Sequence, residues 1–423
     1  MPNSTAPSRP ARSRPPAWRI LIAGGGIPSL TLGLALRQGA GEAAEVTIVD
    51  PGRTGRAPDM RAYAISPAAM RMFGALGVGE ALRLRAQPIT AMSITDSRAA
   101  DVVRPEYLAF EAEDRDAPLG FMLESAVLTD ALGSAARNAG VRFETGTVTS
   151  LEAAPGEIRV GGPHGESRPV ALLVAADGAR SRLREAAGIG WTGRRYRQSA
   201  LVATIAHERP HGGRAVQHFL PGGPFAILPL AGGGTNLPHR SSIVWTEMED
   251  EARALAAAPA GLALPAVEAR FGHVLGAIVL ETRLQAVPLS VGLARGFVAN
   301  RIALLGDAAH EIHPLAGQGL NLGLADAASL AEHVVDAIRL GLDPAGTDVL
   351  RAYERDRRFD AVALAGVTDA LNRLFSNDSL PIRALRDLGL GIVDRAPGLK
   401  GLFARGASGE TRRAPRLMRG EAL

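Results

Sequence analysis

A short apolar segment that stops at three consecutive glycines constrains the fold of this chain most. Residues 18–23 (WRILIA) have the pattern of a buried strand and end at Gly24-Gly25-Gly26. Residues 30–37 have the pattern of a helix, and residues 45–50 (EVTIVD) have that of a second strand. Strand, glycine turn, helix and strand in this order open the βαβ unit of dinucleotide-binding domains. We therefore predict an α/β fold built on a Rossmann-like parallel sheet.

The glycine turn reads G-x-G-x-x-S, with Gly24, Gly26 and Ser29 at its three key positions. The two glycines let the backbone turn tightly and approach a pyrophosphate, which unpaired N–H groups at a helix N-terminus bind. Asp50 ends the second strand, where a carboxylate accepts hydrogen bonds from the ribose of an adenosine. Ser29 replaces the third glycine, which weakens the match. A glycine turn without a ligand is the alternative.

Composition excludes several classes of protein. The 423 residues exceed one average domain, so one large domain or two interleaved domains are expected. The formal net charge is +4, but the arginines are scattered and aromatic residues make up only 4%, which argues against nucleic-acid binding. There is no cysteine, and this removes disulfides, thiolate nucleophiles and cysteine-based metal sites.

The sequence shows no sign of secretion or membrane insertion. Residues 1–17 are rich in Pro, Ser and Arg and lack the apolar core of a signal peptide, so we expect a disordered tail. No apolar run approaches the roughly 20 residues of a membrane span. We expect a cytoplasmic protein, with peripheral contact at the inner face of the membrane as an open alternative.

The pattern of strand-like and helix-like segments changes twice along the chain. From residue 191 to 285, short β-like segments such as LVATIAHE and FAILPL are separated by Gly/Pro turns, which predicts an antiparallel sheet. The segment RIALL (301–305) again resembles a buried strand, and residues 321–340 and those from 348 onward are helical in pattern. We predict a discontinuous nucleotide-binding domain (residues 18–85, 115–190 and 286–345), a mixed or antiparallel β-sheet domain for the substrate (86–114 and 191–285) and a C-terminal helical region (346–423).

Two further segments combine glycine with charge. AADGARSRLR (175–184) places Asp177 and Gly178 in a tight turn after a strand, and a solvated turn is the alternative. GDAAHEIHPLAGQGLNLGLAD (306–326) places the Asp307 carboxylate just past the end of a buried strand, where α/β folds contact their ligands. Its glycine-rich second half leads into a helix, so the backbone can lie against a flat ring and direct N–H groups at it.

Asp307, His310 and His313 also suggest a metal site by their number and spacing. However, Pro314 restricts His313 to extended geometry, so a helical pairing with His310 is unfavourable. We predict no metal. A histidine acting as a catalytic base remains an alternative to histidines that only support the structure.

Taken together, GGGIPS, ADGARS and GDAAHEIHPLAGQGLNLGLAD resemble, in this order, the FAD-dependent aromatic hydroxylases. HPLAGQGLNLGLAD, with RAYAISPAAMRMFGALGV and YERDRRFDAVALAGVTDALNRLFS, resembles the ubiquinone-biosynthesis hydroxylases, which act on polyprenylphenols and demethoxyubiquinol. The resemblance covers roughly residues 18–409. It implies the aromatic-hydroxylase fold.

The resemblance also implies roles for matching residues. It places Gly24, Gly26 and Asp50 at the ADP half of FAD, Asp177 and Gly178 in a motif shared by FAD and NAD(P)H, and Arg61 near the flavin. The third segment supplies the remaining FAD contacts: Asp307 for the ribityl chain, and Gly306, Pro314, Gly317, Gln318, Gly319 and Asn321 around it and the isoalloxazine ring. No catalytic side chain is predicted; the candidates at the flavin face are Gly317, Gln318 and Gly319. Two positions depart from the family pattern: Ser29, and Ala126 where many members have an arginine.

The implied reaction is that of a monooxygenase. NAD(P)H reduces FAD, O₂ adds at flavin C4a, and the hydroperoxide transfers oxygen to the ring of a polyprenylated phenol or quinol; the cofactor carries this chemistry. The 371–402 region, apolar with interleaved arginines, is a candidate membrane surface, and other quinone-biosynthesis proteins or a second copy are candidate partners. Hydroxylation of a soluble aromatic compound, or a catalytically silent FAD-binding scaffold, are the rival functions.

Overall fold

The computed structural model describes residues 17–52, 59–96, 106–112, 117–162, 165–220, 223–312, 317–375 and 414–423. Its centre is a six-stranded sheet in the order β19-β20-β12-β1-β2-β8. All neighbours are parallel except the edge pair β19/β20. The strands are β1 (Trp18–Ala23), β2 (Ala44–Asp50), β8 (Arg142–Thr145), β12 (Leu172–Ala175), β19 (Val298–Ala299) and β20 (Ile302–Leu304).

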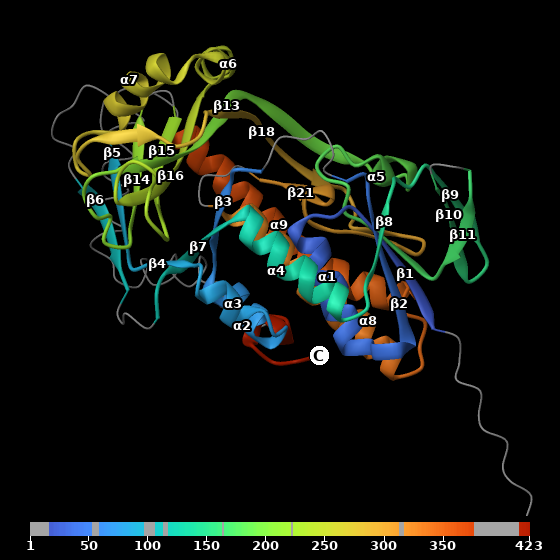
Figure 1. The fold of residues 1–423 in the computed structure, drawn as a ribbon. Helices are drawn as coiled ribbons and strands as arrows, with labels where there is room; N and C mark the ends of the chain where they lie inside the picture. The colour runs from blue at the N-terminus through green and yellow to red at the C-terminus, as the bar shows by residue number, and fades with distance from the viewer. Residues whose placement is uncertain are drawn as a thin grey trace, which may run out of the picture.

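Both faces of this sheet are covered, which is why its central strands are continuous apolar runs. Helices α1 (Ile27–Ala40), α4 (Ser125–Asn138) and α8 (Gln318–Arg339) pack together on one side. A small antiparallel sheet of β9 (Ser150–Ala154), β10 (Glu157–Gly161) and β11 (Ser167–Val170) covers the other (Figure 1). One hydrophobic core joins all three layers.

The second large element is a nine-stranded mixed sheet on the other side of the molecule (Figure 1). Among its described strands, only the β14/β5 pair is parallel. Helices α6 (Glu249–Ala257) and α7 (Ala260–Phe271) cover its outer face. The strands are β5 (Ala91–Asp96), β6 (Glu106–Glu111), β13 (Trp191–His207), β14 (Arg214–Leu220), β15 (Gly223–Leu230), β16 (His239–Met248), β17 (Ile278–Leu280), β18 (Gln285–Ala294) and β21 (His310–Glu311).

A three-stranded sheet lies where the two large units meet. It consists of β3 (Ala62–Ile65), β7 (Gly120–Glu124) and β4 (Gln87–Ile89), with β7 in the middle. Its apolar residues, including Ala62, Ala64 and Met122, form a small cluster with Leu228 and Leu230 of β15. The remaining helices are η1 (Gly41–Ala43), α2 (Pro67–Ala75), α3 (Gly79–Arg83), α5 (Arg182–Ala186), η2 (Gly306–Ala308), α9 (Thr347–Phe375) and α12 (Arg416–Arg419).

The predicted fold class is confirmed: a Rossmann-like domain is interleaved with a mixed sheet, and helices follow it. Residues 67–83 form two helices, α2 and α3, because Gly77 adopts a positive φ of 77° between them. One detail differs from the sequence expectations. The large sheet continues through β18 to Ala294, beyond the expected limit of 285, because β18 pairs with β13 along its length.

Two expectations concern residues that the structure treats only in part. The predicted tail lies outside the described residues up to residue 16. The candidate membrane surface at 371–402 also lies outside them, apart from the backbone of the last turn of α9. Among the helices that are described, none has both the length and the hydrophobicity that a membrane crossing requires.

Candidate functional site

The first glycine turn follows β1 at the carboxyl edge of the parallel sheet. Gly24 has a φ of +121°, and a Cβ there would lie 2.1 Å from the carbonyl oxygen of Ala176. Glycine is therefore required at position 24 because two strand ends come together there. Gly26 is the N-cap of α1 and makes no side-chain cap, so the N–H groups of the first helical turn have no partner within the helix. Such an end favours an anionic ligand.

Asp50 closes this turn from the neighbouring strand. Its Oδ2 accepts a hydrogen bond from the Gly25 N–H at 2.8 Å, and its Oδ1 accepts one from the Gly52 N–H at 2.8 Å. Each oxygen keeps a further acceptor position, so the side chain can still accept hydrogen bonds from hydroxyl groups.

Ser29 is accommodated without a glycine at its position. It is buried on α1. The helix approaches β2 closely at Gly33, one turn later, where a Cβ would lie 3.0 Å from Ile48 Cδ1. Thus Gly33, which lies outside the sequence motif, provides a close helix–strand contact of the kind that the third glycine of the motif allows.

The second motif forms a self-contained turn. Asp177 accepts hydrogen bonds from Ser181 Oγ at 2.5 Å and from the Arg182 N–H at 2.9 Å, and so caps α5. Gly178 has a φ of +88°, and a Cβ there would meet no other atom within 4 Å. The Asp177 side chain is exposed and engaged locally, so its predicted part in cofactor binding stays a prediction.

Arg184, in the same segment, links the second motif to the third. It is buried, and its guanidinium donates to the carbonyl oxygens of Ala179 and Ala308, both at 3.0 Å. It also stacks over the Trp191 ring at 4.1 Å. Sequence reasoning missed this link because the partners lie up to 124 residues apart.

The third motif brings a second helix N-terminus to the first. After β20, Gly306 has a φ of +59° and starts η2. A Cβ on Gly323, in the second turn of α8, would lie 3.1 Å from Pro28 Cγ of α1 and 3.4 Å from the Gly306 Cα. These close approaches place the first turns of α1 and α8 next to each other and beside Asp307.

The Asp307 carboxylate has no hydrogen-bond or ion-pair partner among the described residues. Its side chain is exposed, yet protein surrounds it closely enough that burial raises its pKa, against the opposing charges of His310 and Arg61. A carboxylate that protein surrounds but does not cover is both accessible and held at a raised pKa. It is an acceptor available to a ligand hydroxyl.

The start of α8 supplies the glycine-rich surface. Gly317 is its N-cap, in the left-handed region at φ 61°, and Gln318 and Gly319 begin the helix. The Asn321 side chain does not point outward: it accepts from the Ser66 N–H at 2.9 Å and donates to the Ala64 carbonyl at 2.8 Å. Asn321 therefore fixes β3 against α8. Pro314 and His313 lie outside the described residues.

Behind the turn lies a buried charged network. His310 Nε2 and Arg357 Nε contact the two oxygens of Asp326 at 2.5 and 2.9 Å, and the Gly306 N–H donates to the same carboxylate at 3.3 Å. His310 Nδ1 has no hydrogen-bond partner within the described structure. His310 thus supports the Asp307 turn. Over the part of the chain that is described, no group of three or more His, Asp or Glu side chains is arranged to hold a metal ion.

Arg61 directly precedes strand β3. It forms a two-pronged ion pair with Asp59 at 2.8 and 3.0 Å, and Ser125 Oγ, at the start of α4, also donates to Asp59 at 2.7 Å. The Arg61 guanidinium lies 5.5 Å from the Tyr63 ring. Burial raises the pKa of Tyr63 to about 12. Ser125, the neighbour of Ala126, therefore connects the N-terminus of α4 to Asp59.

The donors and acceptors of this region match the chemistry of FAD. Two uncapped helix ends offer N–H groups to a pyrophosphate or an electron-rich ring, and Asp50 and Asp307 offer acceptors to ribose and ribityl hydroxyls. Gly24, Gly306 and Gly317 give the backbone the close turns that this arrangement needs. The fold and the site define a dinucleotide-binding protein whose site fits FAD.

Comparison with known proteins supports and narrows this class. The FAD binding domain family model matches residues 17–367. The chain is 40% identical to the ubiquinone hydroxylase UbiL of Rhodospirillum rubrum over 96% of its own length and 93% of that protein. It is 33% identical to the 3-demethoxyubiquinol 3-hydroxylase of Escherichia coli, covering 90% and 96% of the two chains. The chain belongs to the ubiquinone-hydroxylase family of FAD-dependent monooxygenases.

Solved structures agree on the fold. The p-nitrophenol 4-monooxygenase PnpA of Pseudomonas putida superposes with a TM-score of 0.75 at 20% identity, covering 94% of this chain and 99% of that one. At this identity the match establishes the shared fold. The predicted family, FAD cofactor and monooxygenase class are thus confirmed, whereas the roles of individual site residues stay predictions.

Proposed function

We propose that this enzyme hydroxylates the aromatic ring of a polyprenylated phenol or quinol intermediate in ubiquinone biosynthesis, with NAD(P)H as electron donor and O₂ as co-substrate. The observation that carries the proposal is the 40% identity to a ubiquinone hydroxylase over nearly the whole of both chains. If the two proteins had unrelated substrates, we would expect their sequences to be similar in the cofactor domain and to diverge in the sheet domain.

In this proposal FAD, when bound, supplies the chemistry by accepting electrons from NAD(P)H and activating O₂. The residues of the chain bind and orient it. The first-turn N–H groups of α1 hold the pyrophosphate, Asp50 the ribose, and Asp307 the ribityl hydroxyls. The N–H groups at Gly317, Gln318 and Gly319 stabilise negative charge on the reduced ring, in the way that an oxyanion hole does. Gly26, Gly306, Asn321, Arg61, Asp177 and Gly178 complete the proposed site.

The substrate side follows from the alternation along β15. Phe225 and Ile227 face the helix-covered core, whereas Leu228 and Leu230 belong to the cluster with Ala62 and Ala64 of β3. Ala64 lies against Gly317, 3.4 Å from where a Cβ would stand, and its carbonyl accepts from Asn321. Leu228 therefore faces the same side as the proposed flavin surface. We assign this apolar face to the ring and first prenyl unit of the substrate.

A polyprenyl substrate also requires access to lipid. We propose a cytoplasmic enzyme that contacts the inner face of the membrane peripherally, alone or through other quinone-biosynthesis proteins. Co-sedimentation with vesicles that contain a polyprenylphenol is the measurement for this point. Recovery of all protein in the supernatant at every lipid composition would remove the membrane contact from the proposal.

The function itself is tested with purified protein. The preparation is expected to show flavin absorbance bands, to oxidise NAD(P)H in the presence of a short-chain prenylphenol, and to yield a product heavier by one oxygen. Equal or faster turnover of an unprenylated phenol would favour a soluble aromatic substrate. Flavin-loaded protein that oxidises NAD(P)H with neither class of phenol would favour the scaffold function.

A further inference from the structure

The last ten residues dock back onto the FAD-binding domain. We call residues 414–423 the C-terminal clasp. Leu417 and Met418 of the clasp are 1% and 4% exposed, which makes them as buried as the central core. The clasp packs on α2 and α8 (Figure 1), although residues 376–413, outside the described part, separate it from α9 in the sequence. Burial of two large apolar side chains is its main attachment.

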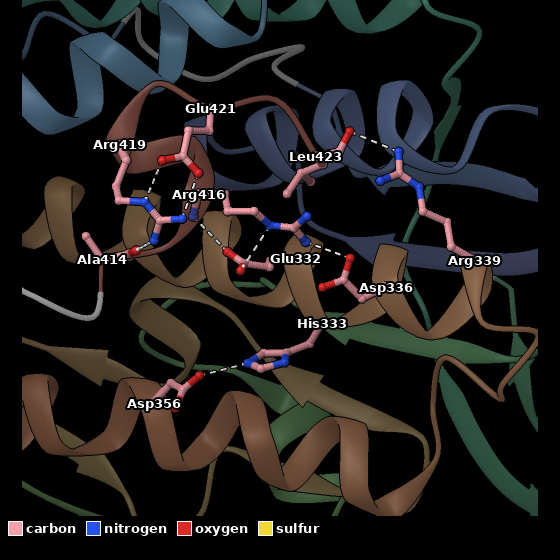
Figure 2. A network of polar contacts seen from close by, with 10 residues as sticks. All are labelled: Glu332, His333, Asp336, Arg339, Asp356, Ala414, Arg416, Arg419, Glu421 and Leu423. Atoms are coloured by element: carbon pink, nitrogen blue, oxygen red, sulfur yellow. Dashed lines mark hydrogen bonds and ion pairs between the residues drawn. The ribbon is translucent and has the colours of Figure 1, made fainter.

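Charged contacts fix its register on α8. Glu332, Asp336 and Arg339 follow one another at helical spacing and form a stripe along one side of α8. Arg416 donates its backbone N–H to Glu332 at 2.8 Å, its Nε to the same carboxylate at 3.1 Å, and its terminal nitrogen to Asp336 at 2.6 Å. Figure 2 shows Arg416 lying across this stripe, with the His333–Asp356 pair on another side of the helix.

Further hydrogen bonds link residues within the clasp and connect it to α1 and α2. Arg419 donates to the Ala414 carbonyl at 2.7 Å and pairs with Glu421 at 2.7 Å (Figure 2). Arg71 of α2 donates to the Met418 carbonyl at 3.2 Å. Arg339 donates to the Leu423 oxygen at 2.9 Å and to the Gly39 carbonyl of α1 at 2.8 Å. The clasp is therefore attached to three helices at once.

Two of these helices, α1 and α8, carry the proposed cofactor site, and α2 joins it through its N-cap Ser66, whose N–H donates to Asn321 of α8. At one end, α1 and α8 meet through Pro28 and Gly323, beside Asp307. At the other end they meet at Gly39, where a Cβ would lie 2.8 Å from Val335 Cγ2 and 3.2 Å from Leu423 Cβ. The clasp thus covers the end of the helix pair that lies away from the site. Because packed helices resist bending, the spacing at one end constrains the spacing at the other.

We infer that the C-terminal clasp is a strap that holds α1, α2 and α8 at the spacing which FAD binding requires, so that clasp docking and FAD binding strengthen each other. This inference rests on FAD lying at the α1 and α8 N-termini and is independent of the substrate. Coupling between two sites is reciprocal. Undocking the clasp must weaken FAD binding, and FAD must stabilise the docked clasp by the same factor.

The first test measures FAD affinity of the full-length apoprotein by flavin fluorescence. Leu417→Asp is expected to raise the FAD dissociation constant at least about tenfold, as expected for a charge placed at a buried apolar site. Leu84→Asp is the matched control, because Leu84 lies in the same domain but is 80% exposed. It is expected to leave the constant unchanged. If Leu417→Asp shows no cooperative unfolding transition and is therefore not folded, Arg416→Ala decides alone, with an expected rise of about threefold. An unchanged constant in every variant that folds overturns the inference.

The second test uses the reciprocal direction, which a merely structural tail would not show. FAD added to the apoprotein is expected to slow hydrogen exchange at Met418, Arg419 and Gly420, whose N–H groups bond within the clasp. In a chain truncated after residue 413, a synthetic 414–423 peptide is expected to restore FAD affinity, and the same peptide with Leu417→Asp is expected not to. Exchange in the clasp that is insensitive to saturating FAD overturns the coupling. Both tests report on FAD binding, so a wrong substrate assignment would not affect them.

Discussion

His310 Nε2 lies 2.5 Å from Asp326 Oδ2, and neither side chain reaches solvent. Burial alone would raise the pKa of Asp326, but the charges and hydrogen bonds of His310 and Arg357 outweigh it and hold that pKa below the usual value. The same carboxylate accepts the Gly306 N–H, so this ionised, buried group supports the turn that presents Asp307.

Asp326→Asn should therefore damage both stability and cofactor binding. The substitution leaves the Arg357 guanidinium buried without its main counter-charge, and we expect a loss of about 3 kcal/mol in the free energy of unfolding. FAD affinity should fall with it. Urea unfolding of the apoprotein measures the first effect. Asp356→Asn, which removes the half-exposed partner of His333, is the control and should cost less than about 1 kcal/mol. Equal losses in the free energy of unfolding of the two variants would show that the buried network stabilises the fold no more than the half-exposed pair does.

Gly24→Ala should be far more harmful than an alanine at another glycine with positive φ. At Gly24 the new Cβ meets the Ala176 carbonyl oxygen at 2.1 Å, whereas at Gly156, with φ +74°, nothing lies within 4 Å. We expect a loss of about 3 kcal/mol or more for Gly24→Ala and about 1 kcal/mol for Gly156→Ala. Thermal unfolding of both variants measures the difference. A stable Gly24→Ala protein would mean that β1 and β12 end further apart than described.

The two faces of β15 should separate stability from substrate binding. Ile227→Ala opens a cavity under α6 and α7 and should cost about 3 kcal/mol with little change in KM. Leu228→Ala lies on the apolar face toward β3, is only partly buried, and should raise KM for a prenylated phenol while costing about 1 kcal/mol. Steady-state kinetics and unfolding on the same samples check this. The assignment of the substrate face fails if Leu228→Ala leaves KM unchanged.

Stability should fall as the pH drops below about 6.5. Burial lowers the pKa of His207 and of His211 in the folded chain. A base with a lowered folded pKa stays neutral while its unfolded counterpart gains a proton, so its stabilising contribution is present above the unfolded pKa and is lost as the pH falls toward the folded one. His211→Ala should flatten this dependence below about pH 6.5. Identical pH slopes in wild type and His211→Ala would contradict it.

Much of the fold was predictable because its determinants are local. The apolar run that ends at Gly24, the strand that ends at Asp50 and the strand before Gly306 each lie within a few residues, and the structure contains all three. The ordered series of glycine motifs also predicted the family and the cofactor. What could not be predicted depends on contacts between distant residues: Arg184 with Ala308, Arg357 with Asp326, and the clasp with Glu332. No periodicity pairs such groups, because each is an ordinary polar side chain or backbone carbonyl until the topology brings its partner close.

Asn321 shows the same limit inside a recognised motif. Its position in the glycine-rich segment predicted a place beside the ring, yet its side-chain amide is directed to the backbone of Ser66 and Ala64. Its direct part in binding would therefore be through its backbone. The spacing of the motif predicts where the residue lies, but the direction of its side chain follows from β3, which is about 255 residues away.

Mass spectrometry of the quinones made under ¹⁸O₂ by a strain lacking this gene, carrying either the wild-type chain or Asp307→Ala, tests the central claim most directly. We predict that the wild-type chain restores ubiquinone with one additional labelled oxygen. Asp307→Ala, which should fold normally but retain no FAD, should instead leave a precursor that lacks this oxygen. Normal labelled ubiquinone in the strain without the gene would contradict the proposed function, and full restoration by a flavin-loaded Asp307→Ala protein would contradict the proposed site.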